Sequence, residues 1–451
     1  METTTTPIHP PMLAADLLQH HVADNVEFLN TLPDEEAAGL IAALPLERAV
    51  EILDQPELYR APELIELMPA ERAAALLTGM AADRAADVVH LLENPAGLLA
   101  RLDPETKASI ERLLVYPPDT AGSLMTTEFV SVPSTSTVEQ TLQHVRQVER
   151  TRETIYAIYV LDPQTKRLLQ AVPLRRLISA PPEASILSAA RPYAPITTSP
   201  LTDREEVARL FRKYDLLAVP VVDNAGRVLG IVTVDDAIDA MLAESTEDVQ
   251  KFGGVLAIEK PYMQIGFAEM IGKRAGWLCA LFLSEMLTAS AMQHFESELE
   301  KAIVLTLFIP LIMSSGGNSG SQATSLLIRS LALRELNLSD WWRVALRELP
   351  TGVALGAILG VIGMLRIGLW QELGFYNYGA HWELVALTVA AALIGIVTFG
   401  SVSGSMLPFV LQKLGFDPAS ASAPFVATLV DVSGLVIYFS VALVILRGTL
   451  L

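Results

Sequence analysis

Hydrophobic residues follow two different patterns along the chain. Up to about residue 260, short apolar runs alternate with charged and proline-containing stretches, as in a soluble protein. Beyond residue 275, apolar stretches follow one another, and each is long enough to cross about 30 Å of hydrocarbon. These stretches predict five membrane-spanning helices: Ala275–Met292, Ala302–Leu331, Thr351–Leu369, Leu384–Leu411 and Pro424–Leu446. A soluble half is therefore expected to precede an all-α membrane domain over residues 273–451.

The first part of the soluble half carries a helical repeat. From residue 16 to residue 114, apolar residues recur at helical spacing between short connections that contain proline. Three of the runs open with the same Glu/Asp-Arg-Ala start, at Glu47–Ala49, Glu71–Ala73 and Asp83–Ala85. We expect an all-α superhelical domain over residues 1–124. The repeat is as consistent with a plain scaffold as with a sensor.

A second repeat, with a period of about 60 residues, fills residues 125–242. Ile155–Ser179 aligns with Leu216–Asp239, so that Asp162 and Asp223 occupy equivalent positions in the two copies. Each copy reads as strand, turn, strand and helix, because β-branched apolar runs flank the turn sequences DPQTK and DNAGR. The sequence therefore predicts the same α/β unit twice.

This duplicated order resembles a tandem pair of CBS regulatory domains. The resemblance implies that an adenine nucleotide such as ATP is bound by an acidic residue early in the helix that follows the paired strands. The second copy has Asp235 and Asp236 at that place, whereas the first copy has Arg175 and Arg176. Asp235 is therefore the candidate nucleotide-binding residue, and the first copy departs from the pattern.

Residues 243–272 are expected to form a helical connecting segment, and basic residues beyond it orient the membrane domain. Those near span ends fall mostly on one side: Lys273, Arg274, Arg329, Arg334, Arg343, Arg347 and Lys413. That side should be cytoplasmic, which puts the N-terminus inside and the C-terminus on the periplasmic or extracellular side. The N-terminal METTTTPIHPPML has no feature of a secretory signal. Trp341 and Trp342 are expected to begin a short helix along the inner surface.

Composition limits the chemistry that the chain can carry. The chain has 451 residues, 51% of them hydrophobic, and a net charge of −19. Its single cysteine, Cys279, excludes an intrachain disulfide, and its seven histidines show no zinc-binding spacing. We find no nucleophile with an adjacent base and no glycine-rich phosphate loop, so we do not expect an enzyme. A nucleic-acid partner is not expected either. Hard oxygen ligands must carry any metal chemistry.

Two polar features interrupt the apolar spans. GGNSGSQ (Gly316–Gln322) gathers glycines and side-chain oxygens in the second span, which is typical of a small-residue packing face or of a pore lining. Asp431 lies among apolar residues of the last span, where a carboxylate costs roughly 2.5–3.5 kcal/mol unless it meets water or a cation. Ala427 and Thr428 share its helix face. The pattern favours a pore-facing stripe over a buried, protonated carboxyl group.

Several segments resemble the MgtE family of magnesium channels: Gly316–Gln322, Ser403–Phe409, Pro424–Gly434 and Thr233–Asp248. The order of helical domain, CBS pair, connecting helix and five spans agrees as well, so the resemblance covers nearly the whole chain. It implies a homodimer in the lipid bilayer of the bacterial inner membrane, with a pore for Mg2+ along the dimer axis. It also implies that Asp431 is the pore acid, with Thr428, Ala427 and Asn318 beside the ion path.

The chain departs from the family pattern at two positions. Ser321 stands where the family usually has the second Asn of GGNxGNQ, and Ala423 precedes Pro424 where the family has an Asn near the inner pore mouth. Both changes remove an amide oxygen from the implied ion path. Selectivity or conductance is therefore expected to differ from that of other members.

Acidic residues of the soluble half and the connecting helix are candidates for magnesium sensing. Between Asp235 and Asp248 the chain has no basic residue, whereas a solvated helix face normally mixes both signs. The resemblance implies that cytoplasmic Mg2+ bridges these acids and closes the channel; solubility alone is the other explanation for them. The candidate regulatory residues are Asp83, Asp87, Glu205, Asp215, Asp236, Asp239, Glu244, Glu247 and Asp248.

Two other functions fit the same residues. In an exchanger driven by protons or sodium, Asp431 would serve as a relay for the coupling ion. A membrane-anchored CBS receptor would conduct nothing and signal through a partner. The polar GGNSGSQ run together with Asp431 argues against the receptor, since an anchor needs neither.

Overall fold

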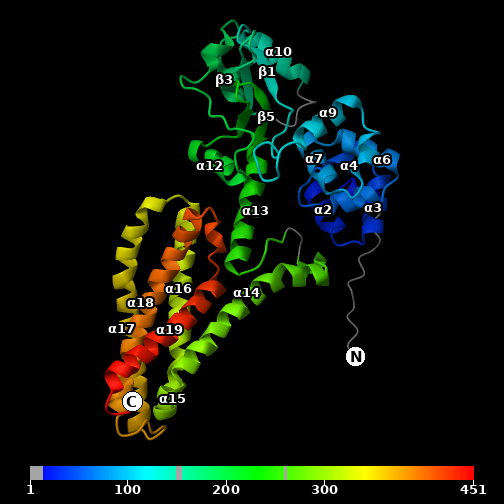
Figure 1. Ribbon diagram of the computed structural model, residues 1–451. Helices are drawn as coiled ribbons and strands as arrows, with labels where there is room; N and C mark the ends of the chain where they lie inside the picture. Colours follow the sequence, from blue (N-terminus) through cyan, green and yellow to red (C-terminus); the bar gives the residue numbers. More distant parts are fainter. Residues whose placement is uncertain (1–13, 149–154, 259–261, 451) are drawn as a thin grey trace. The chain divides into compact units, whose positions relative to one another are not determined.

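The computed structural model describes residues 14–148, 155–258 and 262–450 (Figure 1). The chain folds as two compact units, residues 1–242 and 243–451. The expected fold class is confirmed, because an all-α N-terminal domain, an α/β CBS pair and five long apolar helices follow one another. The first 13 residues, for which no secretory signal is expected, lie outside the described residues. The finer division into four segments stays a prediction.

The N-terminal domain consists of short helices: α1 (Ala14–Leu17), α2 (Val22–Leu29), α3 (Asp34–Ala43), α4 (Leu46–Leu53), α5 (Ala61–Glu66), α6 (Ala70–Gly79), α7 (Ala82–Leu91), α8 (Pro95–Leu99) and α9 (Pro104–Leu113). Each packs on the next helix but one, α2 on α4, α3 on α5, α4 on α6 and α5 on α7, which builds a superhelix. Apolar side chains at helical spacing fill the core, and Leu29, Ile41 and Leu64 have no exposed surface.

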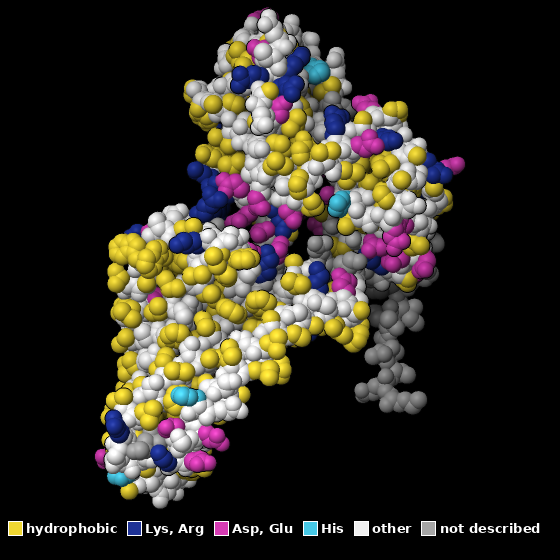
Figure 2. Space-filling model, viewed as in Figure 1, with side chains coloured by type: hydrophobic (Ala, Val, Ile, Leu, Met, Phe, Trp, Pro, Cys, Tyr) yellow, Lys and Arg dark blue, Asp and Glu magenta, His cyan; other side chains and the backbone are white. Residues whose placement is uncertain are grey.

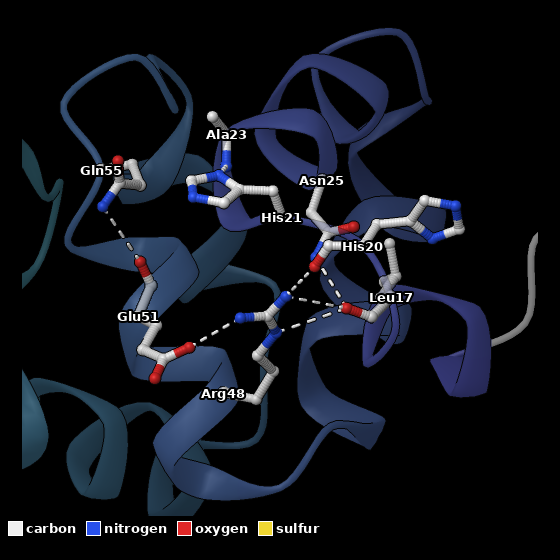
Figure 3. Close-up of polar contacts among 8 residues, drawn as sticks. All are labelled: Leu17, His20, His21, Ala23, Asn25, Arg48, Glu51 and Gln55. Atoms are coloured by element: carbon white, nitrogen blue, oxygen red, sulfur yellow. Dashed lines mark hydrogen bonds and ion pairs between the residues drawn. The ribbon is translucent and has the colours of Figure 1, made fainter.

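Arginines of the Glu/Asp-Arg-Ala repeat bind the ends of neighbouring helices. Arg48 donates from Nε and Nη2 to the Leu17 carbonyl at 3.3 and 3.2 Å, and also to the His20 carbonyl (Figure 3). Arg84 donates in the same way to the Leu53 carbonyl at 3.3 Å, and in both pairs the carbonyl lies 31 residues earlier. Carbonyls at a helix end have no partner within the helix. The repeated arginine therefore has a structural role in the domain.

The CBS pair repeats one fold. In the first copy, β1 (Val130–Pro133) runs parallel to β2 (Ala157–Leu161), which pairs antiparallel with β3 (Leu168–Pro173). In the second copy, β4 (Ala218–Val222) pairs antiparallel with β5 (Val228–Thr233), and a single parallel bridge at Val221 takes the place of the outer strand. The helices of the pair are α10 (Val138–Val148), α11 (Leu174–Ser179), η2 (Ile186–Ala189), α12 (Arg204–Tyr214) and α13 (Val234–Phe252).

The aligned aspartates of the two copies stabilise similar turns, which differ by one residue in length. The Asp162 carboxylate accepts a hydrogen bond from the Thr165 N–H at 2.7 Å, and that of Asp223 accepts one from the Arg227 N–H at 2.8 Å. These backbone donors hold the pKa of both carboxyl groups below the usual value. The duplication that the sequence predicts is therefore present in the fold.

Five helices of the second unit are long and apolar enough to cross a membrane: α14 (Phe267–His294), α16 (Ile309–Ala332), α17 (Trp341–Glu372), α18 (Trp382–Lys413) and α19 (Ala423–Leu446). Hydrophobic side chains dominate their visible surface, and charged ones gather toward the ends of the helices (Figure 2). Each predicted span corresponds to one of them. Shorter connecting elements are η3 (Tyr262–Gln264), α15 (Glu296–Lys301), η4 (Ile303–Phe308), η5 (Leu338–Asp340) and η6 (Pro418–Ser420).

The third span differs most from the prediction. The sequence suggests a short surface helix that begins at Trp341 and Trp342, and a separate span from Thr351, directly after Pro350. The structure has one continuous helix, α17, from Trp341 to Glu372. Proline removes one backbone donor, and a helix that is packed along its length can continue through that defect. The prediction of a separate surface helix is therefore wrong.

Glycines bring α16 and α18 into close contact. A Cβ added to Gly400 would lie 2.3 Å from the carbonyl oxygen of Gly316. One turn further, a Cβ added to Gly404 would lie 2.3 Å from the carbonyl oxygen of Gly320. The Thr324 hydroxyl joins the two helices here by donating to the Gly404 carbonyl at 2.7 Å. The packing of these spans depends on the absence of side chains at the crossing.

Replacing Arg48 by Met tests the helix-end contacts. The variant keeps most of the apolar stem but removes the hydrogen bonds of Arg48 to the Leu17 and His20 carbonyls, while the Asn25 amide still donates to Leu17. We therefore expect the unfolding free energy to fall by about 1–3 kcal/mol. Unfolding of residues 1–242, followed by circular dichroism, measures the change. Arg112→Met is the matched control, since Arg112 donates within its own exposed helix. Equal losses in the two variants would contradict the structural role of the repeat.

Gly400→Ala tests the glycine crossing. The added methyl has to push two backbones apart, so we expect a loss of about 1–3 kcal/mol and a lower melting temperature in detergent. Gly276→Ala adds the same methyl to α14 at a position with nothing within 4 Å. Size-exclusion chromatography after heating, with fluorescence detection, compares the two. If both proteins survive heating as the parent does, the crossing tolerates a side chain and the packing argument fails.

Candidate functional site

The last helix carries the principal candidate. α19 begins at Ala423, and the hydroxyl of the preceding Ser422 accepts the Phe425 N–H at 3.4 Å. Asp431 lies near the middle of this helix and is half-buried, although the preceding Val430 belongs to the core of the unit. None of the described residues gives the Asp431 carboxylate a hydrogen bond. Water or a cation is the partner that this arrangement leaves open.

The structure separates the two other residues of the predicted stripe on α19. Thr428 is only 8% exposed, and its hydroxyl donates to the Pro424 carbonyl at 3.0 Å. Ala427 is half-buried and lies against α16. A Cβ added to Gly317 of α16 would lie 3.4 Å from the Cβ of Ala427. Ala427 therefore continues the half-exposed edge of Asp431, whereas Thr428 turns into the bundle.

Asn318 lies at the level of this edge on the neighbouring span. α16 and α19 pack in opposite directions, since Gly316 would meet Val430 and Gly320 would meet Val426 if each carried a Cβ. Asn318 falls between these two levels and is exposed. The structure thus brings Asn318 to the same depth as the first half of α19, on a face of α16 that its own bundle does not cover.

The GGNSGSQ segment combines both functions that its composition suggests. Its glycines Gly316, Gly317 and Gly320 are buried against other helices. Asn318 and Gln322, one turn apart, are exposed instead. The packing interpretation therefore holds for the glycines, and a polar lining stays a prediction for the amides.

The two departures from the family pattern meet in space. The Ser321 hydroxyl lies 3.4 Å from the carbonyl oxygen of Ala423, so the two positions join α16 to the first residue of α19. They therefore form one local feature at the beginning of α19. Any effect of these substitutions on the ion path is expected to be a joint effect.

The end of the connecting helix rests against the beginning of α19. Lys251 lies 2.6 Å from Glu247, one turn earlier, and 2.6 Å from Asp417 in the loop before α19. Burial lowers the pKa of Lys251, but the hydrogen bonds to Asp417 and Glu247 outweigh it and raise the pKa above the usual value. Gly254, with φ of +74°, has no room for a Cβ, which would lie 2.5 Å from Cδ1 of Trp277. The connection therefore contacts α14 and the loop before the candidate pore helix through specific groups.

Several predicted regulatory acids gather around one arginine of the soluble unit. Arg84 interacts electrostatically with Asp83 and Asp87 of its own helix and also with Asp54 and Glu57. Burial raises the pKa of Asp54 to about 6, although the Ala81 N–H and Arg84 lower it. Four carboxylates of the described residues thus act on this one guanidinium.

Asp239 of α13 joins the same cluster. Burial raises its pKa, and the charges of Glu57 and Asp235 raise it further, against the effect of Arg84. The fold thus brings the predicted acids Asp83, Asp87 and Asp239 together from distant parts of the sequence. A second cation would relieve the repulsion between Asp239 and the acids Glu57 and Asp235.

The other predicted acids are more dispersed. Asp215 is exposed and ends α12 in the left-handed conformation with φ of 51°, which gives it a structural role as a helix cap. Glu205 is exposed in the first turn of the same helix, and Asp236 accepts a hydrogen bond from the Thr233 hydroxyl at the start of α13. Among the described residues, no three Asp, Glu, His or Cys side chains are grouped closely enough to hold a metal ion. Half-buried acids in the second part of α13 are Glu244, Glu247 and Asp248.

Sequence reasoning missed four residues of these sites. Asp54, Glu57 and Arg84 belong to the cytoplasmic cluster but lie outside the acidic run of α13 that drew attention. Glu285 lies within the first span and interacts electrostatically with Asp431. Its signal was available, since a single acid within an apolar span is itself a functional indicator.

Comparison with known proteins decides the family. The chain is 42% identical over 350 residues to "Magnesium transporter MgtE" of Thermus thermophilus. The matched region covers 77% of this chain and 74% of that protein. It is 35% identical over 343 residues to "Magnesium transporter MgtE" of Enterococcus faecalis, with coverage of 76% and 73%. The chain belongs to the MgtE family. The suspected family resemblance is thereby confirmed.

Family models match three separate parts of the chain. The MgtE model, described as a divalent cation transporter, matches residues 309–441. The MgtE intracellular N domain matches residues 20–119, and the CBS domain matches residues 192–243. This MgtE-family chain is thus a multi-pass membrane protein with an intracellular N-terminal domain.

Two solved structures are similar to the soluble half. A structure described as the cytosolic domain of the Mg2+ channel MgtE in complex with ATP is 37% identical, covers 50% of this chain and 92% of its own, and has a TM-score of 0.47. The soluble part of a magnesium transporter is 32% identical, covers 51% and 91%, and has a TM-score of 0.48. The assignment to the MgtE family rests on the sequence relatives and the family models.

Proposed function

We propose that the protein is a homodimeric Mg2+ channel of the bacterial inner membrane, with its N-terminus in the cytoplasm and its C-terminus on the outer side. The observation that carries the proposal is Asp431, a half-buried carboxylate in the middle of an apolar span. Membership in a family of divalent cation transporters supports it, as do relatives named magnesium transporters. The exposed faces of the membrane helices provide surface for lipid and for a second subunit.

The chemistry of Mg2+ fits a site with few carboxylates. Mg2+ gives up its octahedral water shell reluctantly and is commonly bound through one or two carboxylates, with several waters retained. One Asp431 from each subunit would supply two such groups. Asn318 and the backbone beside Ala427 would accept hydrogen bonds from the retained waters. Binding of this kind is favourable without being tight, as conduction requires.

The acidic cluster around Arg84 is the proposed sensor of cytoplasmic Mg2+. Its carboxylates are partly desolvated and outnumber the nearby positive charge, so a divalent cation would stabilise the closed arrangement. Asp83, Asp87 and Asp239 belong to this cluster. Glu205, Asp236, Glu244, Glu247 and Asp248 are further candidates along α12 and α13, whereas the helix-capping conformation of Asp215 makes it the weakest.

Several weak Mg2+ sites would together be enough to close the channel. Four cations, each at about ten times its dissociation constant, would contribute roughly 1.4 kcal/mol apiece, or about 5.5 kcal/mol together. That is about the free energy that moves a two-state gate from 1:99 to 99:1. High internal Mg2+ would close the channel, and low internal Mg2+ would open it.

ATP binding at the second CBS copy is a subsidiary proposal. Asp235 is exposed in the first turn of α13, where a CBS pair places its ribose-binding acid. In the first copy the exposed Arg175 and Arg176 occupy that place, which does not suit a ribose hydroxyl. The relative solved with ATP makes the nucleotide a reasonable first ligand to test.

Coupled exchange is the principal rival. Nothing in the geometry of Asp431 excludes a relay role for a proton or sodium ion. Patch recordings from reconstituted protein separate the two functions. Unitary current steps without a counter-ion support the channel, and flux that strictly requires a second ion supports exchange.

Asp431→Asn tests the pore site. The amide keeps the size of the side chain but removes its charge, so we expect Mg2+ uptake by cells that lack other magnesium transporters to fall at least tenfold. Glu383→Gln, an exposed acid in the first turn of α18, is the control and should transport as the parent does. Parent-like uptake by Asp431→Asn, at equal protein levels, would remove the proposed pore site.

Neutralising the cytoplasmic cluster tests the sensor. The combined change of Asp87→Asn and Asp239→Asn removes two cation-attracting charges, so we expect channel closure to need roughly ten times more cytoplasmic Mg2+. Inside-out patches measure the current against Mg2+ at the cytoplasmic face. Glu27→Gln with Glu36→Gln removes two exposed charges elsewhere in the domain as a control. If the cluster variant closes at the same cytoplasmic Mg2+ concentration as the parent, the sensor assignment is contradicted.

A further inference from the structure

The first span contains an acid that the pore described above does not use. Glu285 lies within α14, a helix with membrane-spanning hydropathy. It is half-buried on a helix that has no fully buried residue. A carboxylate at such a depth costs roughly 2.5–3.5 kcal/mol on insertion scales, so it is expected to face a charge, water or a cation.

Two contacts fix the alignment of α14 with α19. In the first half of α14, the Trp277 indole N–H donates to the Ser422 hydroxyl at 3.0 Å, just before α19 begins. Directly after α14, Phe295 stacks on Phe439, with 5.0 Å between the ring centroids. Both helices therefore run in the same direction along this contact.

These contacts place Glu285 at the level of Asp431. Glu285 lies about midway between Trp277 and Phe295, and Asp431 lies about midway between Ser422 and Phe439. Their carboxylates interact electrostatically. One turn further on α14, the hydroxyl of Thr288 is buried and has no hydrogen-bond partner among the described residues. Two acids and an unsatisfied hydroxyl thus lie at about the same depth of an apolar bundle.

Repulsion makes this arrangement unfavourable without a cation. Two negative charges in a medium of low dielectric destabilise each other, and neither α14 nor α19 carries a Lys or Arg between the contacts described above; His294 lies at the far end of that stretch of α14. A divalent cation balances both charges at once. Because Mg2+ keeps most of its waters, a hydroxyl such as that of Thr288 would accept a hydrogen bond from the hydrated ion.

We propose that Glu285 is a second carboxylate of the ion pathway, which acts with Asp431 to attract a hydrated divalent cation. The inference rests on the proposed function, because it takes Asp431 as the acid past which Mg2+ moves. It adds α14 to the helices that contribute to the pathway. It also doubles the number of carboxylates that each subunit presents at this depth.

Mg2+ uptake into proteoliposomes tests the inference with the full-length chain. Uptake is measured over graded external Mg2+ for the parent, Glu285→Gln, Glu285→Asp and the control Glu269→Gln, which removes an exposed acid from the first turn of the same helix. We expect Glu285→Gln to raise the concentration for half-maximal uptake about tenfold, because one attracting charge is lost. Glu285→Asp should restore most of the affinity, and Glu269→Gln should match the parent.

Asp431→Asn, measured alongside, separates the possible failures. If Glu285→Gln behaves as Glu269→Gln does while Asp431→Asn is impaired, the inference is overturned and the pore function stands. If Asp431→Asn transports normally, the proposed function fails and the carboxylate pair fails with it. An amide is easier to place in hydrocarbon than a carboxylate, so misfolding is not expected of Glu285→Gln. If Glu285→Asp is as poor as Glu285→Gln at normal protein levels, a packing role explains both and the inference is overturned.

Discussion

Negative charge held at mid-depth in an apolar bundle is the constraint that the membrane unit has to satisfy. Asp431 occupies a helix whose neighbouring positions pack into the core, so its carboxylate is solvated only at the edge of the bundle. The surrounding spans must remain tightly packed without covering that edge. Buried glycines on α16 meet this requirement, because they draw α18 and α19 close on one side while the amides of Asn318 and Gln322 stay exposed on the other.

The soluble unit also concentrates negative charge, but it does so around an arginine. Carboxylates from the N-terminal helices and from α13 are gathered around Arg84, and their partial burial makes each negative charge more costly than it would be in water. This is why the cluster is the proposed sensor of cytoplasmic Mg2+. Both units thus concentrate negative charge where the fold alone does not neutralise it, and a divalent cation is the simplest complement in each.

Much of this could be predicted from the sequence. The five spans follow from hydropathy, and the paired CBS units follow from the alignment of Asp162 with Asp223, because both signals are local. Asp54, Glu57 and Arg84 were missed, since their membership of the cluster depends on which helices become neighbours, and Glu285 was missed although an acid within an apolar span is a local signal. The continuous α17 was also missed: Pro350 is a local signal for a break, and the packing of the whole helix overrides it. The sites therefore depended on tertiary contacts more than the fold did.

Arg84 has two sets of partners, and they limit how the cluster can respond. Its guanidinium donates to the carbonyls of Leu53, Gln55 and Leu58, so it is anchored to the backbone as well as surrounded by acids. An ion bound at the proposed sensor would not displace a cation that is tethered in this way and would have to share the carboxylates with it. The attraction that the ion experiences is smaller than the number of acids suggests, which favours reversible occupancy over permanent capture.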